Sequence, residues 1–253
     1  MTNRHQRLHQ MLQQDLVELK LRKIAETYRE VLDEGARKNT PLLEVLSNLI
    51  AGEVTVRRQR ALERRIRQAK LPPRKTLEDF DFNFPSRIPK QKILRLFDCE
   101  FVEQHQSAVL IGKTGRGKSH LLNALGYTAC EKGISVRWTR VIDMINVLTT
   151  AQINGTLEKK LREYTRPDLL LLDELGYLPI DKRGSDLMFQ VVAARYECNS
   201  IVITTNRTFR DWGKLFNTDT TLATAIIDRL MHHGEAMVID AKRSYRNPED
   251  DAQ

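Results

Sequence analysis

The chain has 253 residues, of which 41% are hydrophobic and 29% charged, as is typical of a soluble globular protein with one sizeable core and a small second domain. No apolar segment approaches the length that crosses a bilayer and no apolar leader begins the chain, so we expect a cytoplasmic protein without a membrane partner. Cys99, Cys130 and Cys198 are widely spaced and odd in number, which argues against a disulfide framework or a zinc site and favours buried, inert thiols.

The formal net charge of +8 is concentrated in one stretch. Residues 1–75 contain 17 Lys/Arg and 9 Asp/Glu, whereas residues 76–253 contain 24 of each. Residues 57–75 alone hold nine basic residues and one acidic residue, Glu63. A charge run is commonly a solvated helix face, but a face this basic repels itself and favours a polyanion such as double-stranded DNA. The predicted DNA contacts here are Arg57, Arg58, Arg60, Arg64, Arg65, Arg67 and Lys70.

The first part of the chain is predicted to be a small all-helical domain. Apolar residues recur at helical spacing over residues 8–70. Pro72 and Pro73 end the basic helix, because proline cannot continue the hydrogen-bond ladder. We therefore predict a helical domain over 1–75 and a second domain over 76–253.

The second domain is predicted to be α/β. Its first residues contain Phe80, Phe82 and Phe84 in alternation, which is consistent with an edge strand or with an extended segment laid across the domain. Short apolar strands then alternate with helices, which predicts a parallel sheet covered on both faces. We expect strands near 107–112, 134–138, 169–173, 200–205 and 235–240, and helices that begin near 118, 141, 185 and 221.

The segment SAVLIGKTGRGKSHLL, residues 107–122, matches the P-loop pattern GxxxxGK[ST] between a predicted strand and a predicted helix. Glycines let the backbone wrap around a polyphosphate, and the N–H groups and dipole of the new helix face the same anion. Lys118 is expected to reach the β- and γ-phosphates of ATP, and the Ser119 hydroxyl to bind Mg²⁺. The predicted nucleotide contacts are Gly112, Lys113, Thr114, Gly115, Arg116, Gly117, Lys118, Ser119 and His120.

Polar residues that end two further apolar strands complete the predicted site. In RPDLLLLDELGYLP, Asp173 is expected beside Ser119 as a second Mg²⁺ ligand. Glu174 is placed to orient and deprotonate a water that attacks the γ-phosphate, which favours hydrolysis over transfer to a metabolite. Asn206, at the end of SIVITTNR, is expected to hold that water or the γ-phosphate; a turn asparagine is the alternative.

Two C-terminal arginines are candidates for contact with the phosphates, with a structural salt bridge as the alternative for each. Arg229 lies in an otherwise apolar helix, where a guanidinium without a partner is costly, and it is a candidate catalytic residue acting on a neighbouring subunit's nucleotide. Arg246 is a second nucleotide-binding candidate.

His232 and His233 are adjacent, so on a helix they diverge by about 100° and suit one metal ion poorly. We expect them to be helix-end or packing residues.

Together these segments resemble the AAA+ class of P-loop ATPases, and more narrowly the IstB-like ATP-binding helpers encoded beside transposases in bacterial insertion sequences. The resemblance covers about residues 75–247. It rests on FDF (80–82), GKTGRGKSHL, LLLLDELGYLP, RYE (195–197), TTNRTFRDW (204–212), DRLMHH (228–233) and SYR (244–246). It implies an AAA+ P-loop domain with a three-layer, five-stranded parallel sheet, related to DnaC-type helicase loaders and DnaA-type initiators.

The resemblance also implies roles for individual residues. They are Lys118 and Ser119 in Walker A, Asp173 and Glu174 in Walker B, Asn206 as sensor 1, Arg229 as the arginine finger that acts in trans, and Arg246 as sensor 2. The glycine usual a few positions before SYR is replaced here by Ala241-Lys242-Arg243. Residues 141–165 form an insertion of the kind that often contacts DNA in this class. Cations there and nearby that we predict to contact DNA are Arg140, Lys159 and Lys160.

These features predict an ATP-dependent DNA-binding protein that assembles with copies of itself on DNA and presents target DNA to a cognate transposase. ATP would bind between subunits, and its hydrolysis would release the assembly. A replicative helicase loader shares almost every motif and is the closest alternative. A small-molecule kinase would need an acceptor pocket and an arginine-rich lid, and a structural adaptor that only binds ATP would not need Glu174 or Asn206.

Overall fold

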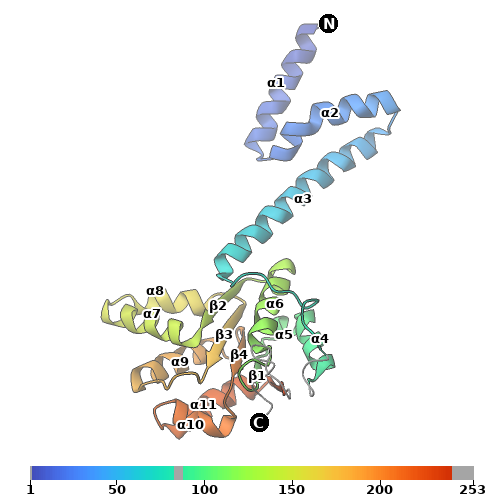
Figure 1. Ribbon diagram of the computed structural model, residues 1–253. Coiled ribbons are helices and arrows are strands. Elements are labelled where there is room, and N and C mark those ends of the chain that lie inside the picture. The colour runs from blue at the N-terminus through green and yellow to red at the C-terminus, as the bar shows by residue number, and fades with distance from the viewer. Residues whose placement is uncertain (1, 83–87, 241–253) are drawn as a thin grey trace. The chain divides into compact units, whose positions relative to one another are not determined.

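The structure, a computed structural model, describes residues 2–82 and 88–240, with side chains from residue 4 onward (Figure 1). The chain divides into two compact units after residue 64. This division falls inside the long helix α3, Leu42–Ala69, whereas the boundary predicted from the sequence follows residue 75 and stays a prediction. Within the described ranges, no helix combines the length and the apolar character that a membrane span requires.

The first unit is all-helical, as predicted. It consists of α1, Thr2–Glu18, α2, Arg22–Lys38, and most of α3. Leu16, Ile24 and Tyr28 form its small buried core. These apolar side chains recur at helical spacing, which is why the sequence pattern predicted helices here.

Glu53 is a buried carboxylate of α3 that holds the start of α2. Its Oε2 accepts hydrogen bonds from the backbone N–H groups of Lys23 and Ile24 at 2.8 and 3.3 Å, and its Oε1 accepts one from Arg57 Nε at 3.0 Å. Burial acts to raise the pKa of Glu53, but these hydrogen bonds together keep that pKa below its usual range. Arg57 also donates to the carbonyl oxygen of Lys20 at 3.1 Å, so this predicted DNA contact has a structural role.

The second unit is built on one parallel sheet of five strands in the order β2-β3-β4-β1-β5, which confirms the predicted sheet. The strands are β1 (Ala108–Ile111), β2 (Val136–Arg140), β3 (Leu169–Leu175), β4 (Ser200–Thr205) and β5 (Glu235–Val238). Every residue of the central strand β4 is buried, because helices cover both of its faces. All five strands run the same way, so their carboxyl ends meet at one edge.

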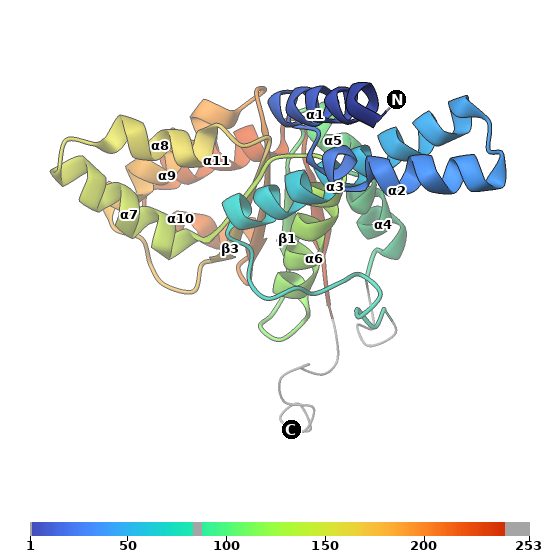
Figure 2. The same ribbon diagram turned by 90° about the horizontal axis from the view of Figure 1, so that it is seen from above.

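Helices form the outer two of three layers, with α4 to α6 on one face of the sheet and α7 to α11 on the other (Figure 2). Side chains alternate along β3 accordingly. Leu171 lies on the face covered by α6, since its Cδ1 would be 2.9 Å from a Cβ at Gly126. Leu170 and Leu172 belong to the buried cluster of the opposite face. The helices are α4 (Lys90–Asp98), α5 (Glu100–Glu103), α6 (Lys118–Glu131), α7 (Val141–Ile153), α8 (Leu157–Thr165), α9 (Lys182–Arg195), η1 (Phe209–Asp211), α10 (Trp212–Leu215) and α11 (Thr220–Met231).

The segment that follows α3 packs along α6. The side-chain amide of Asn123 donates to the carbonyl oxygen of Pro73 at 3.0 Å, and Phe80 is buried. The described part of this segment contains no strand, so the extended-segment alternative holds for Phe80 and Phe82. Phe84, the third of the alternating phenylalanines, lies outside the described residues.

The three cysteines are free thiols, and one of them corrects a prediction. Burial raises the pKa of Cys99 and of Cys130 to about 11, so both are neutral at physiological pH, as expected of inert thiols. Cys198 is exposed instead of buried. It lies in the turn between α9 and β4, outside the layers that cover the sheet.

Candidate functional site

The loop between β1 and α6 takes up residues 112–117, at the carboxyl edge of the sheet. Gly112 has no room for a side chain, because a Cβ there would lie 2.2 Å from the carbonyl oxygen of Ile239. Gly117 has a φ of +85°, and a Cβ there would lie 2.6 Å from the Phe80 ring. Glycine is therefore required at both positions. The helix α6 begins directly after this loop, and a helix N-terminus favours a bound anion.

A cavity of about 280 Å³ lies at this loop and brings most of the predicted residues together. The predicted residues that line it are Thr114, Gly115, Arg116, Gly117, Lys118, Ser119, His120, Glu174 and Asn206. Phe80 of the FDF segment also lines it, together with residues to which the sequence analysis gave no role, namely Lys75, Leu175, Tyr177, Thr204 and Thr205. Lys118 is largely buried, and its Nζ donates to the carbonyl oxygen of Lys113 at 2.8 Å, which holds the ammonium group at the loop.

Asp173 and Ser119 meet as predicted. The Ser119 hydroxyl donates to Asp173 Oδ1 at 2.9 Å, although 53 residues of other structure separate the two along the chain. The Thr204 hydroxyl donates to the same oxygen, and the Glu174 N–H lies 3.1 Å from it. Three donors converge on one buried carboxylate oxygen, which fixes its position next to Ser119, a residue that lines the cavity.

Glu174 occupies a backbone conformation that L-residues rarely adopt. Its φ is +64°, and the pairing of β3 with β4 is irregular between Leu172 and Leu175. The Glu174 N–H is held at 3.0 Å from Thr204 Oγ1. A left-handed residue costs about 1–3 kcal/mol, and such strain concentrates at functional sites because it aims a side chain where a regular strand would not. Here it directs Glu174 to the lining of the cavity.

Asn206 ends β4 at the same cavity. Its Oδ1 is buried and accepts no hydrogen bond from the part of the chain that the structure describes. A buried acceptor in this state costs about 1–3 kcal/mol, so a donor arriving in the cavity is stabilised by it. Gly176 makes this placement possible: its φ is +94°, and a Cβ there would lie 3.2 Å from Asn206 Oδ1.

Aromatic side chains close the other side of the loop. The Phe80 ring lies edge-on to the His120 ring, with centroids 5.5 Å apart, and His120 Nε2 is 2.7 Å from the carbonyl oxygen of Thr76. The cavity therefore offers a cationic, N–H-rich end at the loop and an apolar aromatic wall beside it. This combination suits a ligand with a polyphosphate and a planar ring. The FDF segment was the signal that pointed to Phe80.

Arg229 is absent from the lining of this cavity. It lies on α11, where its Nη1 donates to the carbonyl oxygen of Ala225 at 2.9 Å. Its guanidinium lies over the Phe189 ring at 4.8 Å and near the Tyr196 ring at 5.9 Å. Cation–π contacts with the described residues therefore stabilise its charge, and no ion pair does so among them. Arg246 lies outside the described residues.

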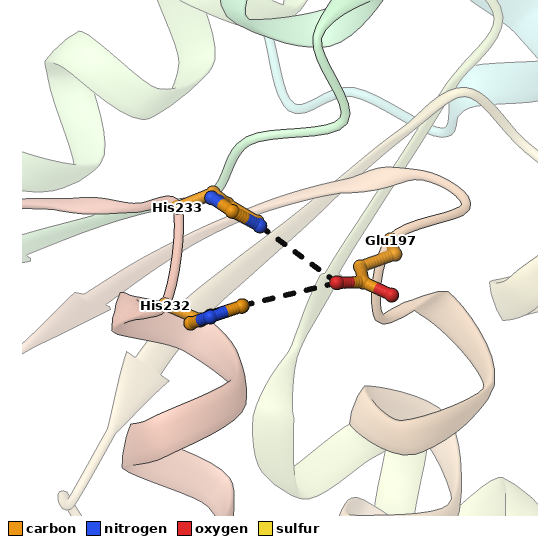
Figure 3. A group of neighbouring side chains, drawn as sticks. All are labelled: Glu197, His232 and His233. Atoms are coloured by element: carbon orange, nitrogen blue, oxygen red, sulfur yellow. Dashed lines mark ion pairs between the residues drawn. The ribbon is translucent and has the colours of Figure 1, made fainter.

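The prediction that His232 and His233 lie at a helix end is confirmed, since α11 ends at Met231 and His232 is its C-cap residue. The prediction that their rings diverge is wrong, because it assumed that both residues lie on the helix. The two rings lie only 4.1 Å apart, and both approach the carboxylate of Glu197 (Figure 3). The two histidines therefore form a cluster with Glu197 at the surface.

The basic residues predicted to contact DNA have different environments. Arg65 donates to the carbonyl oxygen of Cys130 at 3.2 Å, and Arg140 forms an ion pair with Asp143. Arg140 also lies beside Asp173 in the β2–β3 register, which places it at the carboxyl edge of the sheet. Lys160 pairs with Glu163 at 2.6 Å. The remaining predicted contacts are exposed: Arg58, Arg60, Arg64, Arg67, Lys70 and Lys159.

Comparison with protein families gives one match that covers nearly the whole chain. The family described as IstB-like ATP binding protein matches residues 14–251. The chain is 37% identical to the insertion sequence IS232 putative ATP-binding protein of Bacillus thuringiensis, over 94% of both chains. It is 38% identical to the insertion sequence IS21 putative ATP-binding protein of Pseudomonas aeruginosa, over 91% of this chain and 86% of that one.

Comparison with solved structures agrees on the fold. The crystal structure of the DnaC helicase loader matches 65% of this chain and 96% of its own with a TM-score of 0.53 and 19% identity. A TM-score of this size shows a common fold. The five-stranded sheet and its covering helices thus have the AAA+ fold of the DnaC and DnaA structures.

Proposed function

The chain belongs to the family of IstB-like ATP binding proteins, and from this premise we propose that it binds and hydrolyses ATP between neighbouring subunits assembled on double-stranded DNA. We propose further that this assembly presents target DNA to a cognate transposase of an insertion sequence. The observation that carries the proposal is the convergence of Ser119, Glu174 and Asn206 on one cavity at the P-loop, with Asp173 hydrogen-bonded to Ser119. Relatives named for insertion sequences support transposition over helicase loading, although the two share a fold.

The loop end of the cavity would hold the phosphates of ATP. The N–H groups that begin α6 and the ammonium of Lys118 supply positive charge there, and Phe80 offers its ring to the base. Ser119 and Asp173 fit a magnesium ion, since a hydroxyl and a carboxylate oxygen 2.9 Å apart are the oxygen donors that Mg²⁺ prefers. When bound, Mg²⁺ would neutralise charge on the β- and γ-phosphates.

Hydrolysis would depend on two side chains at the edge of the cavity. Glu174 would accept a proton from the attacking water, because its strained backbone places the carboxylate at the cavity instead of under α7. The buried Oδ1 of Asn206 would accept a hydrogen bond from the same water and so fix its direction of attack. Both groups are acceptors, which is what orientation and deprotonation of a water require.

Arg229 would act on the nucleotide of a neighbouring subunit. It lies outside the cavity of its own chain, with its guanidinium held by Phe189 and Tyr196. An arginine supplied in trans stabilises the charge of the transition state and is worth about 10³–10⁵ in rate in related chemistry. Because only the assembled form has a complete site, ATP occupancy would control assembly.

The exposed arginines of α3 would contact the DNA backbone. Arg60, Arg64 and Arg67 are spaced by four and three residues, which places them on one helix face, and all three are exposed. The internal acid Glu63 accepts a hydrogen bond from Gln59 at 3.0 Å. An arginine face of this kind binds phosphates without reading sequence.

The DNA contact is tested by the salt dependence of binding. We expect the wild-type affinity for duplex DNA to fall with a log–log slope of about −5, as for about six phosphate contacts. Replacing Arg60, Arg64 and Arg67 together by Ala should make the slope about 3 units shallower, since each contact contributes about 0.9. Fluorescence anisotropy from 50 to 300 mM salt, roughly, measures this over the range where such contacts dominate.

A matched control removes three exposed arginines from α1 and α2, namely Arg4, Arg7 and Arg22. The control variant should keep the wild-type slope, because its net charge changes equally but the α3 face is intact. An equal loss of slope in both variants would mean that net charge, and not the α3 face, binds DNA.

A further inference from the structure

Three side chains from two separate segments of the chain converge at the surface beside the ends of α9 and α11 (Figure 3). Glu197 Oε1 lies 3.8 Å from His232 Nδ1 and 3.7 Å from His233 Nε2. One potential ligand atom of each residue lies within 4.8 Å of the others. The three side chains are about half exposed, so an ion can reach them from solvent.

The backbone that carries Glu197 is fixed by a buried arginine. Arg195 is 0% exposed, and its guanidinium donates to the carbonyl oxygens of four residues that surround the α9–β4 turn. They are Tyr164, Pro167, Asp168 and Ser200, at 2.6–3.1 Å. Glu197 follows two residues later with a φ of +56°, a strained conformation that this anchored turn maintains.

The backbone that carries the histidines is equally constrained. A Cβ at Gly234 would lie 1.9 Å from the carbonyl oxygen of Leu230 and 2.8 Å from that of Ser107, so only glycine fits there. The next residue, Glu235, donates its N–H to the same Ser107 oxygen at 3.0 Å as β5 begins. His233 is thus held between the end of α11 and a strand whose register is set.

We propose that Glu197, His232 and His233 form a surface binding site for a divalent transition metal ion, with Zn²⁺ as the expected occupant. Two imidazoles and one carboxylate form a common zinc ligand set, with solvent at the fourth position. Tetrahedral bonds of about 2.0–2.1 Å place ligand atoms about 3.4 Å apart. The observed spacings of 3.7 and 3.8 Å to Glu197 need only a small side-chain movement to reach that value.

Tyr196 contacts one of the proposed ligand atoms. Its hydroxyl lies 2.7 Å from His232 Nδ1. A metal ion bound at Nδ1 would replace this hydrogen bond, so this nitrogen would keep one partner. Arg229 lies against the Tyr196 ring, at 5.9 Å from its centroid. An ion here would tie α9 to α11, the two helices that hold Arg229, whether or not nucleotide is bound.

Zn²⁺ binding to the untagged, nucleotide-free full chain tests the site. Isothermal titration calorimetry with ZnCl₂ in excess Mg²⁺ should show one ion per chain at this site. His233→Gln and Glu197→Gln should each weaken its binding at least about 10-fold, because even changes outside the ligand shell cost that much. All of these positions are exposed, so the variants should fold as the wild type does, which circular dichroism checks.

Two control variants keep the ligand set and remove neighbouring donors. His105→Gln alters another histidine near the cluster, and Cys198→Ser removes the exposed thiol next to Glu197. Both should bind Zn²⁺ as the wild type does. Wild-type affinity in His233→Gln and Glu197→Gln would overturn the proposal, since the bound ion would then belong to other donors such as His5 and His9. Absence of Zn²⁺ binding to the wild type would overturn it as well.

Co²⁺ gives an independent spectroscopic measurement on the same proteins. Wild-type protein with one equivalent of Co²⁺ should show the intense visible bands of a four-coordinate ion, and His233→Gln should lose them. The weak spectrum of a six-coordinate ion in the wild type, or an unchanged spectrum in the variant, would contradict the proposed ligands.

Discussion

Glu174→Gln is expected to bind ATP as the wild type does and to lose at least about 100-fold in the rate of hydrolysis, the lower end of what a general base contributes. The amide is nearly isosteric with the carboxylate but cannot accept the proton of water at neutral pH. Because the Glu174 backbone is already held by Asp173 and Thr204, the substitution leaves the geometry of the cavity intact. Single-turnover hydrolysis and ATP binding, measured separately, distinguish loss of chemistry from loss of affinity.

The same variant should also trap the assembly on DNA. If hydrolysis releases the subunits, Glu174→Gln complexes formed with ATP should persist on duplex DNA long after wild-type complexes have dissociated. Glu103→Gln, an exposed glutamate of α5, is the matched control and should behave as the wild type. Prompt dissociation of the Glu174→Gln complex would show that hydrolysis is not the release step.

Arg229→Ala is expected to lower the ATPase rate by about 10³-fold while leaving ATP binding nearly unchanged, since the residue lies outside its own cavity. Lys118→Ala should lose activity for another reason, because it removes the ammonium group that the loop holds where the phosphates of ATP would bind. If each site combines the loop of one subunit with the arginine of the next, an equal mixture of the two inactive variants should recover about a quarter of the wild-type rate. Steady-state ATPase assays of each variant and of the mixture measure this.

The recovery must come from complementary sites. A mixture of Lys118→Ala with the double variant Lys118→Ala/Arg229→Ala contains no intact loop and should stay inactive at every ratio. No recovery in the first mixture, with both variants folded and assembling, would mean that Arg229 only packs against Phe189 and Tyr196.

The P-loop and its partners were predictable because each has a local cause. The glycines of the P-loop stand between a strand pattern and a helix pattern in the sequence, and Asp173 follows from a buried strand that ends at the carboxyl edge of the sheet. Parallel strands bring their ends together, so Ser119 and Asp173 could be paired from the pattern alone. The five strands and the four helices expected to begin near 118, 141, 185 and 221 were recovered within a few residues, whereas α4, α5 and α10 were not predicted.

The residues that were missed depend on contacts between distant segments. In the sequence, Thr204 is one more residue of an apolar strand. Its hydroxyl reaches Asp173 and Glu174 only because of the β3–β4 register. The strain at Glu174 arises from an irregularity in strand pairing that no local propensity encodes. Similarly, Glu197 meets the two histidines because α11 ends at Met231, one residue before His232. The sequence pattern alone would extend this helix through both histidines.

The central claim is that each ATP is shared by two protomers. The most direct test is the ATPase rate per protomer as a function of protein concentration, with and without duplex DNA. Shared sites predict a rate per protomer that rises with concentration until assembly is complete, and a rise at lower concentration when DNA is present. A rate per protomer that is constant down to concentrations where the protein is a monomer, and that DNA does not change, would contradict the claim.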